Sequence, residues 1–366
     1  MSLEEYFREV VGGLRNIAAK FKDPSLFDLN TIPRRIYERR ELLTIAEKLA
    51  EYLVLGIPNN FIIYGPRGSG KTVSILHLLE NAKKVLGLKT FYIKAREYPI
   101  SYHIYRKMAG VSKLGYSTEE LRDRALREFK EKAIIAIDDA DFLEDFEFLN
   151  FFSRNSKASI ILLAQSIQFS KKIDDATYSS LQPSKIYFSE YSADDLYQIL
   201  KMRAEDGLRE WDDITLKLIS AITTRDYRGD ARVAIRALFR VAITNAWGDE
   251  EKIRNAVSEA SREVEEMCLR ELKDHDLVAL FAVSRVRETN KAYVVFNEYI
   301  KKIEGRTLSK PIFFKTLNYL QNLGLITEIR KRVGRYYTIE IELLIDREMI
   351  EKEFKKRFQE LAEQPL

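Results

Sequence analysis

The sequence predicts an α/β fold in which a parallel sheet is covered by helices on both faces, followed by a small helical domain and a C-terminal module. Short, continuously apolar runs alternate with helical patterns in the first half, as expected of parallel strands buried on both faces. No strand signal is present between residues 192 and 266, and three helical segments then precede an alternating stretch. These changes predict domains at 1–190, 191–266 and 267–366.

Composition restricts the class of protein. The 366 residues are 46% hydrophobic and 32% charged, a globular balance that excludes a collagen-like or wholly disordered chain. The single cysteine, Cys268, excludes an internal disulfide framework and fits a reducing compartment. No apolar run approaches the ~18 residues of a membrane span, and the N-terminus has no signal-peptide core. We expect a cytoplasmic, nucleoid-associated protein with no membrane partner.

The first domain opens with a mostly helical stretch over residues 1–60, which a polar break at 23–25 interrupts. Five buried strands are expected after it, at Phe61–Tyr64, Phe91–Ile93, Ala133–Ile137, Ile160–Ala164 and Ile186–Phe188.

A phosphate-binding loop lies between the first of these strands and the helical run from Val73, which is the context in which the P-loop pattern is specific. Its glycines let backbone N–H groups converge on phosphate oxygens, and the following helix directs its positive end at them. Lys71 is expected to reach the β- and γ-phosphates, and the Thr72 hydroxyl to bind magnesium. The loop predicts binding of ATP or ADP with Mg²⁺ through Gly65, Pro66, Arg67, Gly68, Ser69, Gly70, Lys71 and Thr72.

The strand Ala133–Ile137 ends in two carboxylates, Asp138 and Asp139, at the sheet edge where the phosphate loop also lies. We expect Asp138 to hold the magnesium ion and Asp139 to polarise the attacking water. Glutamate is commoner at the second position, and aspartate is shorter by one methylene, ~1.5 Å of reach. Because a misplacement of about 1 Å can cost ~100-fold in rate, hydrolysis is expected to be slow, with Lys71 and Asp139 as the catalytic residues. An exposed acidic loop is the alternative reading.

The last domain is basic. The net charge of the whole chain is +4, and residues 269–366 carry 19 Lys and Arg against 15 Asp and Glu. Three helical segments (269–284, 292–304 and 310–323) and a basic hairpin around Gly334 describe a winged helix. In the third helix, we expect a buried face of Ile312, Phe313, Leu317 and Leu320. The DNA-binding candidates are Lys310, Lys315, Asn318, Tyr319 and Asn322 on that helix and Arg330, Lys331, Arg332 and Arg335 on the hairpin.

With these motifs in place, the chain resembles the archaeal replication initiators of the Orc/Cdc-type AAA+ family over roughly residues 25–360. Beyond the phosphate loop, the resemblance is carried by the order and spacing of Thr90–Arg96, Tyr191–Arg203 and Gly229–Arg232. It implies a P-loop AAA+ domain, a helical lid and a C-terminal winged helix.

The resemblance also implies roles for particular residues. Arg232 would reach from the lid to the nucleotide phosphates, and Tyr191 and Arg203 would contribute to the nucleotide pocket. Gln165 stands where the family's first sensor usually has Asn, with Ser166 as the other candidate. Residues 101–120 occupy the place of an element that contacts DNA in the family, although their apolar side chains suit core packing equally well.

One departure from the family concerns an arginine that would serve a neighbouring subunit's nucleotide, because this chain has Ala176 there. A trans-acting arginine can be worth ~10³–10⁵ in rate, so a weak ATPase at most is expected. The sequence thus predicts an ATP- or ADP-binding initiator that binds duplex DNA at replication origins and uses slow hydrolysis as a switch. A related initiator and the replicative helicase are partners by resemblance only. The alternatives are a remodelling motor whose winged helix docks a substrate, and a DNA-binding regulator that holds ADP.

Overall fold

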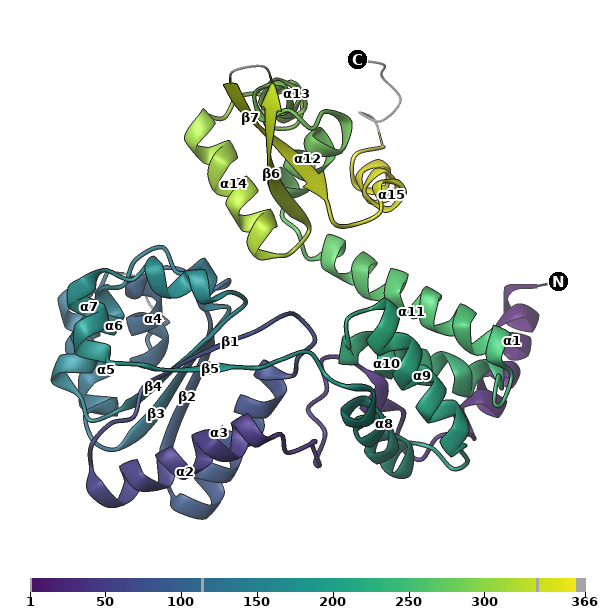
Figure 1. Cartoon of the computed structure of the whole chain (residues 1–366), viewed down its shortest axis with the longest axis horizontal. Coiled ribbons are helices and arrows are strands. Elements are labelled where there is room, and N and C mark those ends of the chain that lie inside the picture. Colours follow the sequence, from purple (N-terminus) through teal and green to yellow (C-terminus); the bar gives the residue numbers. More distant parts are fainter. Residues whose placement is uncertain (1, 113–114, 334–335, 360–366) are drawn as a thin grey trace. The chain divides into compact units, whose positions relative to one another are not determined.

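The computed structural model describes residues 2–112, 115–333 and 336–359, and the chain divides into two compact units, Met1–Ala260 and Ser261–Leu366. The first unit contains a five-stranded parallel sheet with the strand order β2-β3-β4-β1-β5 (Figure 1). The sheet confirms the predicted α/β class. Its strands are β1 (Phe61–Tyr64), β2 (Lys89–Lys94), β3 (Ala133–Asp138), β4 (Ser159–Ala164) and β5 (Ser184–Tyr187).

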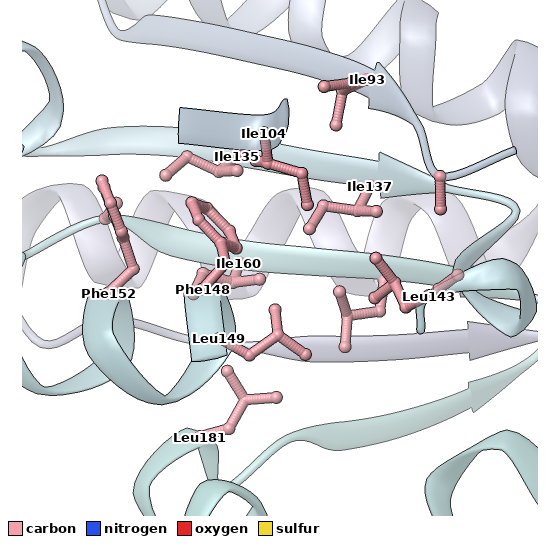
Figure 2. Packing of buried hydrophobic residues seen from close by; sticks show 14 of the residues in the cluster. Ile93, Ile104, Ile135, Ile137, Leu143, Phe148, Leu149, Phe152, Ile160 and Leu181 are labelled. Carbon is pink, nitrogen blue, oxygen red and sulfur yellow. The ribbon is translucent and has the colours of Figure 1, made fainter. Parts of the chain in front are cut away.

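Successive residues of each strand enter opposite faces of the sheet, because side chains alternate along a strand. On one face, Ile135 and Ile137 belong to a core cluster that includes residues of four helices. Figure 2 shows the two isoleucines near Ile104 and Phe148. On the other face, Ile134 and Ala136 belong to a cluster that includes residues of two helices. The sheet is therefore covered on both sides, as continuous apolar strands predict. The four helices are α4 (Ser101–Met108), α5 (Thr118–Phe129), α6 (Glu147–Asn155) and α7 (Asp175–Leu181), and the two are α2 (Arg40–Leu55) and α3 (Lys71–Leu86).

Helix α4 supports the core-packing reading of residues 101–120, whereas a DNA contact of this segment stays a prediction. Ile104, Tyr105 and Met108 are buried in the core cluster under the sheet, and Tyr102 is half-buried against it. The apolar side chains of this helix therefore pack the core. Two residues of the segment, 113 and 114, lie outside the described residues.

The opening stretch is mostly helical, as predicted. Helix α1 (Leu3–Ala18), a short 3₁₀ turn (Pro24–Phe27) and α2 account for most of it, and residues 28–39 contain neither helix nor strand. Pro33 lies in that non-helical segment, and proline lacks the N–H that a helix interior requires.

The segment after the sheet is helical, as predicted. It contains α8 (Ala193–Gly207), α9 (Asp213–Asp226), α10 (Ala231–Thr244) and α11 (Glu250–Arg270). Helix α11 runs past the predicted boundary at 266 and carries the chain from the first unit into the second.

The second unit has the element order expected of a winged helix. Three helices precede an antiparallel hairpin in which Val333 pairs with Tyr336, and the predicted tip at 334–335 lies outside the described residues. A final helix, which the sequence reading missed, stacks Phe354 on Phe281 with ring centroids 3.9 Å apart. The elements are α12 (Asp274–Arg285), α13 (Thr289–Glu304), α14 (Lys310–Asn322), β6 (Ile326–Val333), β7 (Tyr336–Leu343) and α15 (Arg347–Arg357).

Within the described ranges, no helix has both the length and the apolarity that crossing a membrane requires.

Candidate nucleotide site and nucleic-acid interface

The phosphate loop joins β1 to α3 and packs closely against its surroundings. A Cβ on Gly65 would lie 2.1 Å from the carbonyl oxygen of Phe188, so only glycine fits there. Gly70 has a φ of +80°, the left-handed conformation that favours glycine, and it is the N-cap of α3. The loop therefore delivers the chain directly into the helix N-terminus, where backbone N–H groups are free to bind an anion.

Lys71 lies over this loop. Its Nζ donates hydrogen bonds to the carbonyl oxygens of Gly65 and Pro66, at 2.7 and 2.8 Å. Burial lowers the pKa of Lys71 to about 8, although the carboxylates of Asp138 and Asp141 favour its charged form. A cation held in a largely buried position beside the glycines is suited to a phosphate group.

Two variable positions of the loop, Ser69 and Arg67, also interact with other groups of the site. The Ser69 side chain is buried and donates to the Pro66 carbonyl oxygen at 2.9 Å. Arg67 is half-buried, and its charge favours the ionised form of Asp139. The structure therefore brings the predicted loop residues and the predicted acidic pair together.

Asp138 and Thr72 lie together at the carboxyl end of the sheet. The Thr72 hydroxyl donates to Oδ2 of Asp138 at 2.8 Å, and the Asp138 side chain is only 6% exposed. A hydroxyl and a carboxylate in contact are the oxygen ligands that Mg²⁺ prefers, so the residues present fit the predicted metal. Such an ion would neutralise phosphate charge.

Two side chains that the sequence reading did not assign also contact the acidic pair. The hydroxyl of Tyr92, on β2, donates to Oδ2 of Asp138 at 2.7 Å. Arg96, which follows the same strand, places its Nε 3.5 Å from Oδ2 of Asp139. Both residues lie in Thr90–Arg96, which the sequence analysis used only for the family resemblance, and their contacts follow from the pairing of β2 with β3.

Asp139 has a φ of 52°, a left-handed conformation that aspartate tolerates better than most residues. Burial is the main cause of a raised pKa for Asp139, and the adjacent Asp138 adds to it. A carboxyl with this environment is suited to accepting a proton, which is compatible with the predicted role toward water.

Gln165 directly follows β4, beside the acidic turn. Its backbone N–H donates to Oδ2 of Asp141 at 2.6 Å, and its side chain is half-buried. Asp141 itself is buried, which raises its pKa. The predicted sensor residue therefore contacts Asp141, which lies two residues after Asp139.

Arg39, in the segment before α2, is a residue that sequence reasoning missed. Its guanidinium donates to the carbonyl oxygens of Ser69 and Ser189 and lies over the rings of Phe188 and Tyr191. It thereby ties the phosphate loop to the chain that leaves the sheet. No motif marks this arginine, because the segment around it has neither helical nor strand periodicity.

The predicted lid residues Tyr191 and Arg232 both lie at the loop. A Cβ on Gly70 would meet the Tyr191 hydroxyl at 2.0 Å. The N–H of Ala231 donates to the carbonyl oxygen of Gly68 at 3.3 Å, and Arg232 forms an ion pair with Asp230 at 2.6 Å. The start of α10 is therefore in direct contact with the phosphate loop.

Arg203 lies elsewhere. Its guanidinium donates to the carbonyl oxygen of Leu26, and burial lowers its pKa to about 10. Its contact is thus with the N-terminal 3₁₀ turn, and its predicted role in the nucleotide pocket stays a prediction.

Ala176, the position where the resemblance implies an arginine, is exposed on α7. Arg154, from α6, donates to the Ala176 carbonyl oxygen at 3.4 Å and to the Ser180 hydroxyl at 2.8 Å. A guanidinium therefore lies at the same point of the surface, although it comes from a different helix.

Helix α14 carries the predicted DNA-binding side chains. Phe313, Leu317 and Leu320 form its buried face, as predicted, but Ile312 is 41% exposed. The expectation for Ile312 was wrong because it lies about 100° around the helix from Phe313, off the i, i+4, i+7 row. The candidates Lys310, Lys315 and Asn318 are exposed, and Tyr319 and Asn322 are half-buried.

The hairpin candidates are only partly described. Arg330, Lys331 and Arg332 lie on β6, and their side chains are outside the described residues. Arg335, at the predicted tip, also lies outside them.

Comparison with known proteins gives consistent matches. Residues 58–173, which contain the phosphate loop and the acidic pair, match a family described as an AAA domain. An ORC1-type DNA replication protein of Sulfurisphaera tokodaii is 28% identical over 93% of this chain and 94% of its own length. One of Archaeoglobus fulgidus is 26% identical over 93% and 92%. The structure of the Aeropyrum pernix ORC1 protein in complex with DNA is 26% identical, with a TM-score of 0.69 over 92% of this chain and 97% of that one.

Proposed function

We propose that this chain, a relative of the archaeal Orc/Cdc-type AAA+ replication initiators as its motifs predicted, is a nucleotide-regulated initiator that binds duplex DNA at replication origins. The observation that carries the proposal is the meeting of three distant segments at one place. The phosphate loop, the acidic end of β3 and the start of α10 are joined by the Thr72–Asp138 and Ala231–Gly68 hydrogen bonds.

ATP or ADP with Mg²⁺ would bind in this site, with Lys71 at the phosphates and Thr72 and Asp138 at the ion. Hydrolysis would be slow and would change the state of the protein rather than drive a motor. Such a switch works only if the two nucleotide states differ in affinity for DNA or for a partner. Arg232 is suited to reporting the state, because it lies on the helix whose N-terminus touches the loop.

DNA binding would use the exposed face of α14. Asn318 can pair bidentately with adenine, whereas Lys315 can reach guanine or phosphate. A related initiator and the replicative helicase are the protein partners that we propose by resemblance.

Selection of genomic fragments by the full-length protein tests this function, at one near-physiological salt concentration and with ADP or ATP. Salt is fixed because phosphate contacts make non-specific affinity steeply salt-dependent. We expect a few fragments that share a short motif to be retained, with different yields for the two nucleotides. Uniform retention that fades with salt would reject origin recognition and favour the motor with a docking winged helix. Motif-specific retention that ignores the nucleotide would favour the ADP-holding regulator.

Two variants separate base reading from phosphate binding. Asn318→Ala is expected to relax sequence preference by ~1–3 kcal/mol, and Lys315→Ala to weaken binding to all sequences and reduce the salt slope by about 1. Equal effects of the two variants on every DNA would argue against direct readout by α14.

A further inference from the structure

We propose that Tyr92 is a positioning residue of the nucleotide site, whose hydroxyl holds the Asp138 carboxylate in the orientation in which it binds the magnesium ion of a bound nucleotide. The inference rests on the proposed function, because it assigns a role within the same site. Neither the phosphate-loop pattern nor the acidic pair includes this tyrosine.

The carboxylate of Asp138 has three donors around it. Oδ1 accepts the backbone N–H of Asp139 at 2.8 Å. Oδ2 accepts two hydroxyls, those of Thr72 at 2.8 Å and Tyr92 at 2.7 Å. A carboxylate offers about four lone-pair sites, so these three bonds leave one direction open and fix the rotation of the group.

The two hydroxyls on Oδ2 differ in what else they do. Thr72 belongs to the phosphate loop and is itself a predicted magnesium ligand, so it acts together with the nucleotide. Tyr92 belongs to the sheet and binds Asp138 from outside the loop. Tyr92 is therefore suited to orienting the carboxylate whether or not the loop changes conformation.

The register of the sheet explains how Tyr92 reaches this atom. Strand β2 pairs in parallel with β3, with Tyr92 opposite Ala136 and Lys94 opposite Asp138. Residues two apart on a strand share a face, so Tyr92 and Asp138 are on the same side of the sheet. The Tyr92 ring packs in the core cluster beneath α2 and α3, which anchors the hydroxyl on a rigid element.

Partners outside the ligand set orient the ligands of metal sites, and removing one typically costs 10–100-fold in metal affinity. A purely structural role is the alternative, since a partly buried tyrosine hydroxyl ordinarily finds a hydrogen-bond acceptor. The two roles separate if the magnesium dependence of nucleotide binding is measured apart from nucleotide binding itself.

The experiment titrates ADP into the full-length Tyr92→Phe protein, first in EDTA and then at increasing MgCl₂. This substitution keeps the ring and removes only the hydroxyl. We expect the ADP affinity in EDTA to change less than twofold, and the MgCl₂ concentration that gives half of the magnesium effect to rise about tenfold or more. Tyr102→Phe, which removes a hydroxyl from half-buried Tyr102 on α4, is the matched control and should leave both values unchanged.

A Tyr92→Phe protein with an unchanged magnesium titration would overturn the inference, as would an equal loss of affinity in EDTA and in magnesium. Adding Tyr92→Phe, which keeps the ring, to an Asp138→Asn protein provides a second test. Asn has no carboxylate for Tyr92 to orient, so the added Tyr92→Phe substitution should shift the magnesium titration no further. An additional tenfold shift would show that Tyr92 acts on the magnesium dependence through a group other than the Asp138 carboxylate. If the wild-type protein binds ADP neither in EDTA nor with MgCl₂, it is the proposed function that fails.

Discussion

The length of the Asp139 side chain is expected to limit the rate of ATP hydrolysis at this site. Asp139 directly follows β3 in a left-handed conformation, beside Arg96. Asp139→Glu is expected to raise ATP turnover by roughly 10- to 100-fold, because the added methylene restores reach toward the attacking water. The longer side chain tolerates the left-handed conformation less well, so a loss of ~1 kcal/mol in stability is expected as well.

Phosphate release at saturating ATP measures the change in turnover, and thermal unfolding measures the loss of stability. Asp139→Asn is the control, since it keeps the length of aspartate and removes the charge. Equal turnover of the Glu variant and the wild type would show that another feature of the site limits hydrolysis.

Lys71 gives the site a pH dependence. Its pKa of about 8 lies within an accessible range, and only the protonated ammonium attracts phosphate. Below pH 8 the group is mostly charged, whereas above it the charged fraction falls, so ADP affinity should weaken by about fivefold between pH 8 and 9. Titration of ADP at pH 7, 8 and 9 checks this. Lys71→Arg should remove the dependence because arginine stays charged, and the same slope in that variant would assign the titration to another group.

Some residues of the site could be predicted from the sequence and others could not. The phosphate loop and acidic pair could be located because each has a fixed spacing next to a buried strand. Arg39, Tyr92 and Arg96 could not be assigned, because their contacts depend on which segments the fold brings together. Arg39 in particular meets Ser69 and Ser189, 30 and 150 residues away along the chain.

Among the secondary-structure elements, α8 connects the sheet to the lid through a well-defined N-terminus. The Ser192 hydroxyl accepts from the N–H of Asp195 at 3.1 Å, and Asp195 accepts from the N–H of Ser192 at 3.0 Å and from the Tyr37 hydroxyl at 2.5 Å. Asp195→Ala should cost ~1–3 kcal/mol of unfolding free energy, since it removes a capping group and a tyrosine partner.

Urea denaturation followed by circular dichroism measures that cost. Asp213→Ala is a matched control, because Asp213 also accepts from a tyrosine hydroxyl, that of Tyr197, but at an exposed position. A smaller loss is expected there. Equal losses in the two variants would show that the capping box contributes little.

The bounds of the buried strands could be predicted more accurately than those of the exposed edge strands. Strands β1, β3 and β4 lie inside the sheet, and their continuous apolar runs gave bounds within one residue. Strand β5 lies at an edge and alternates in exposure, so its start at Ser184 was missed by two residues. The second-unit helix α12 was placed five residues early because α11 continues without a break to Arg270.

For the molecule as a whole, the two units should respond differently to nucleotide. All the loop and lid residues lie in Met1–Ala260, and none lies in Ser261–Leu366. ADP with magnesium at 100 times its Kd should stabilise the first unit by about 2.7 kcal/mol, which corresponds to about 5–10 °C. Differential scanning calorimetry should show one transition that moves and one that does not.

The Lys71→Ala protein serves as the control for that measurement, and its first transition should stay in place when ADP is added. A single transition that moves as a whole in the wild type would show that the two units unfold together.

The order of the sheet has a consequence for behaviour at high concentration. In the five-stranded sheet, as far as the structure describes it, β2 and β5 are the edge strands, and unpaired edges are where chains join into aggregates. Strand β5 is four residues long and carries Lys185, and β2 carries exposed lysines at both ends, Lys89 and Lys94. A short strand and charged lysines both discourage the addition of a strand from another chain. The exposed residues of β2 and β5, which contribute little to the core, therefore protect the sheet against edge-to-edge association.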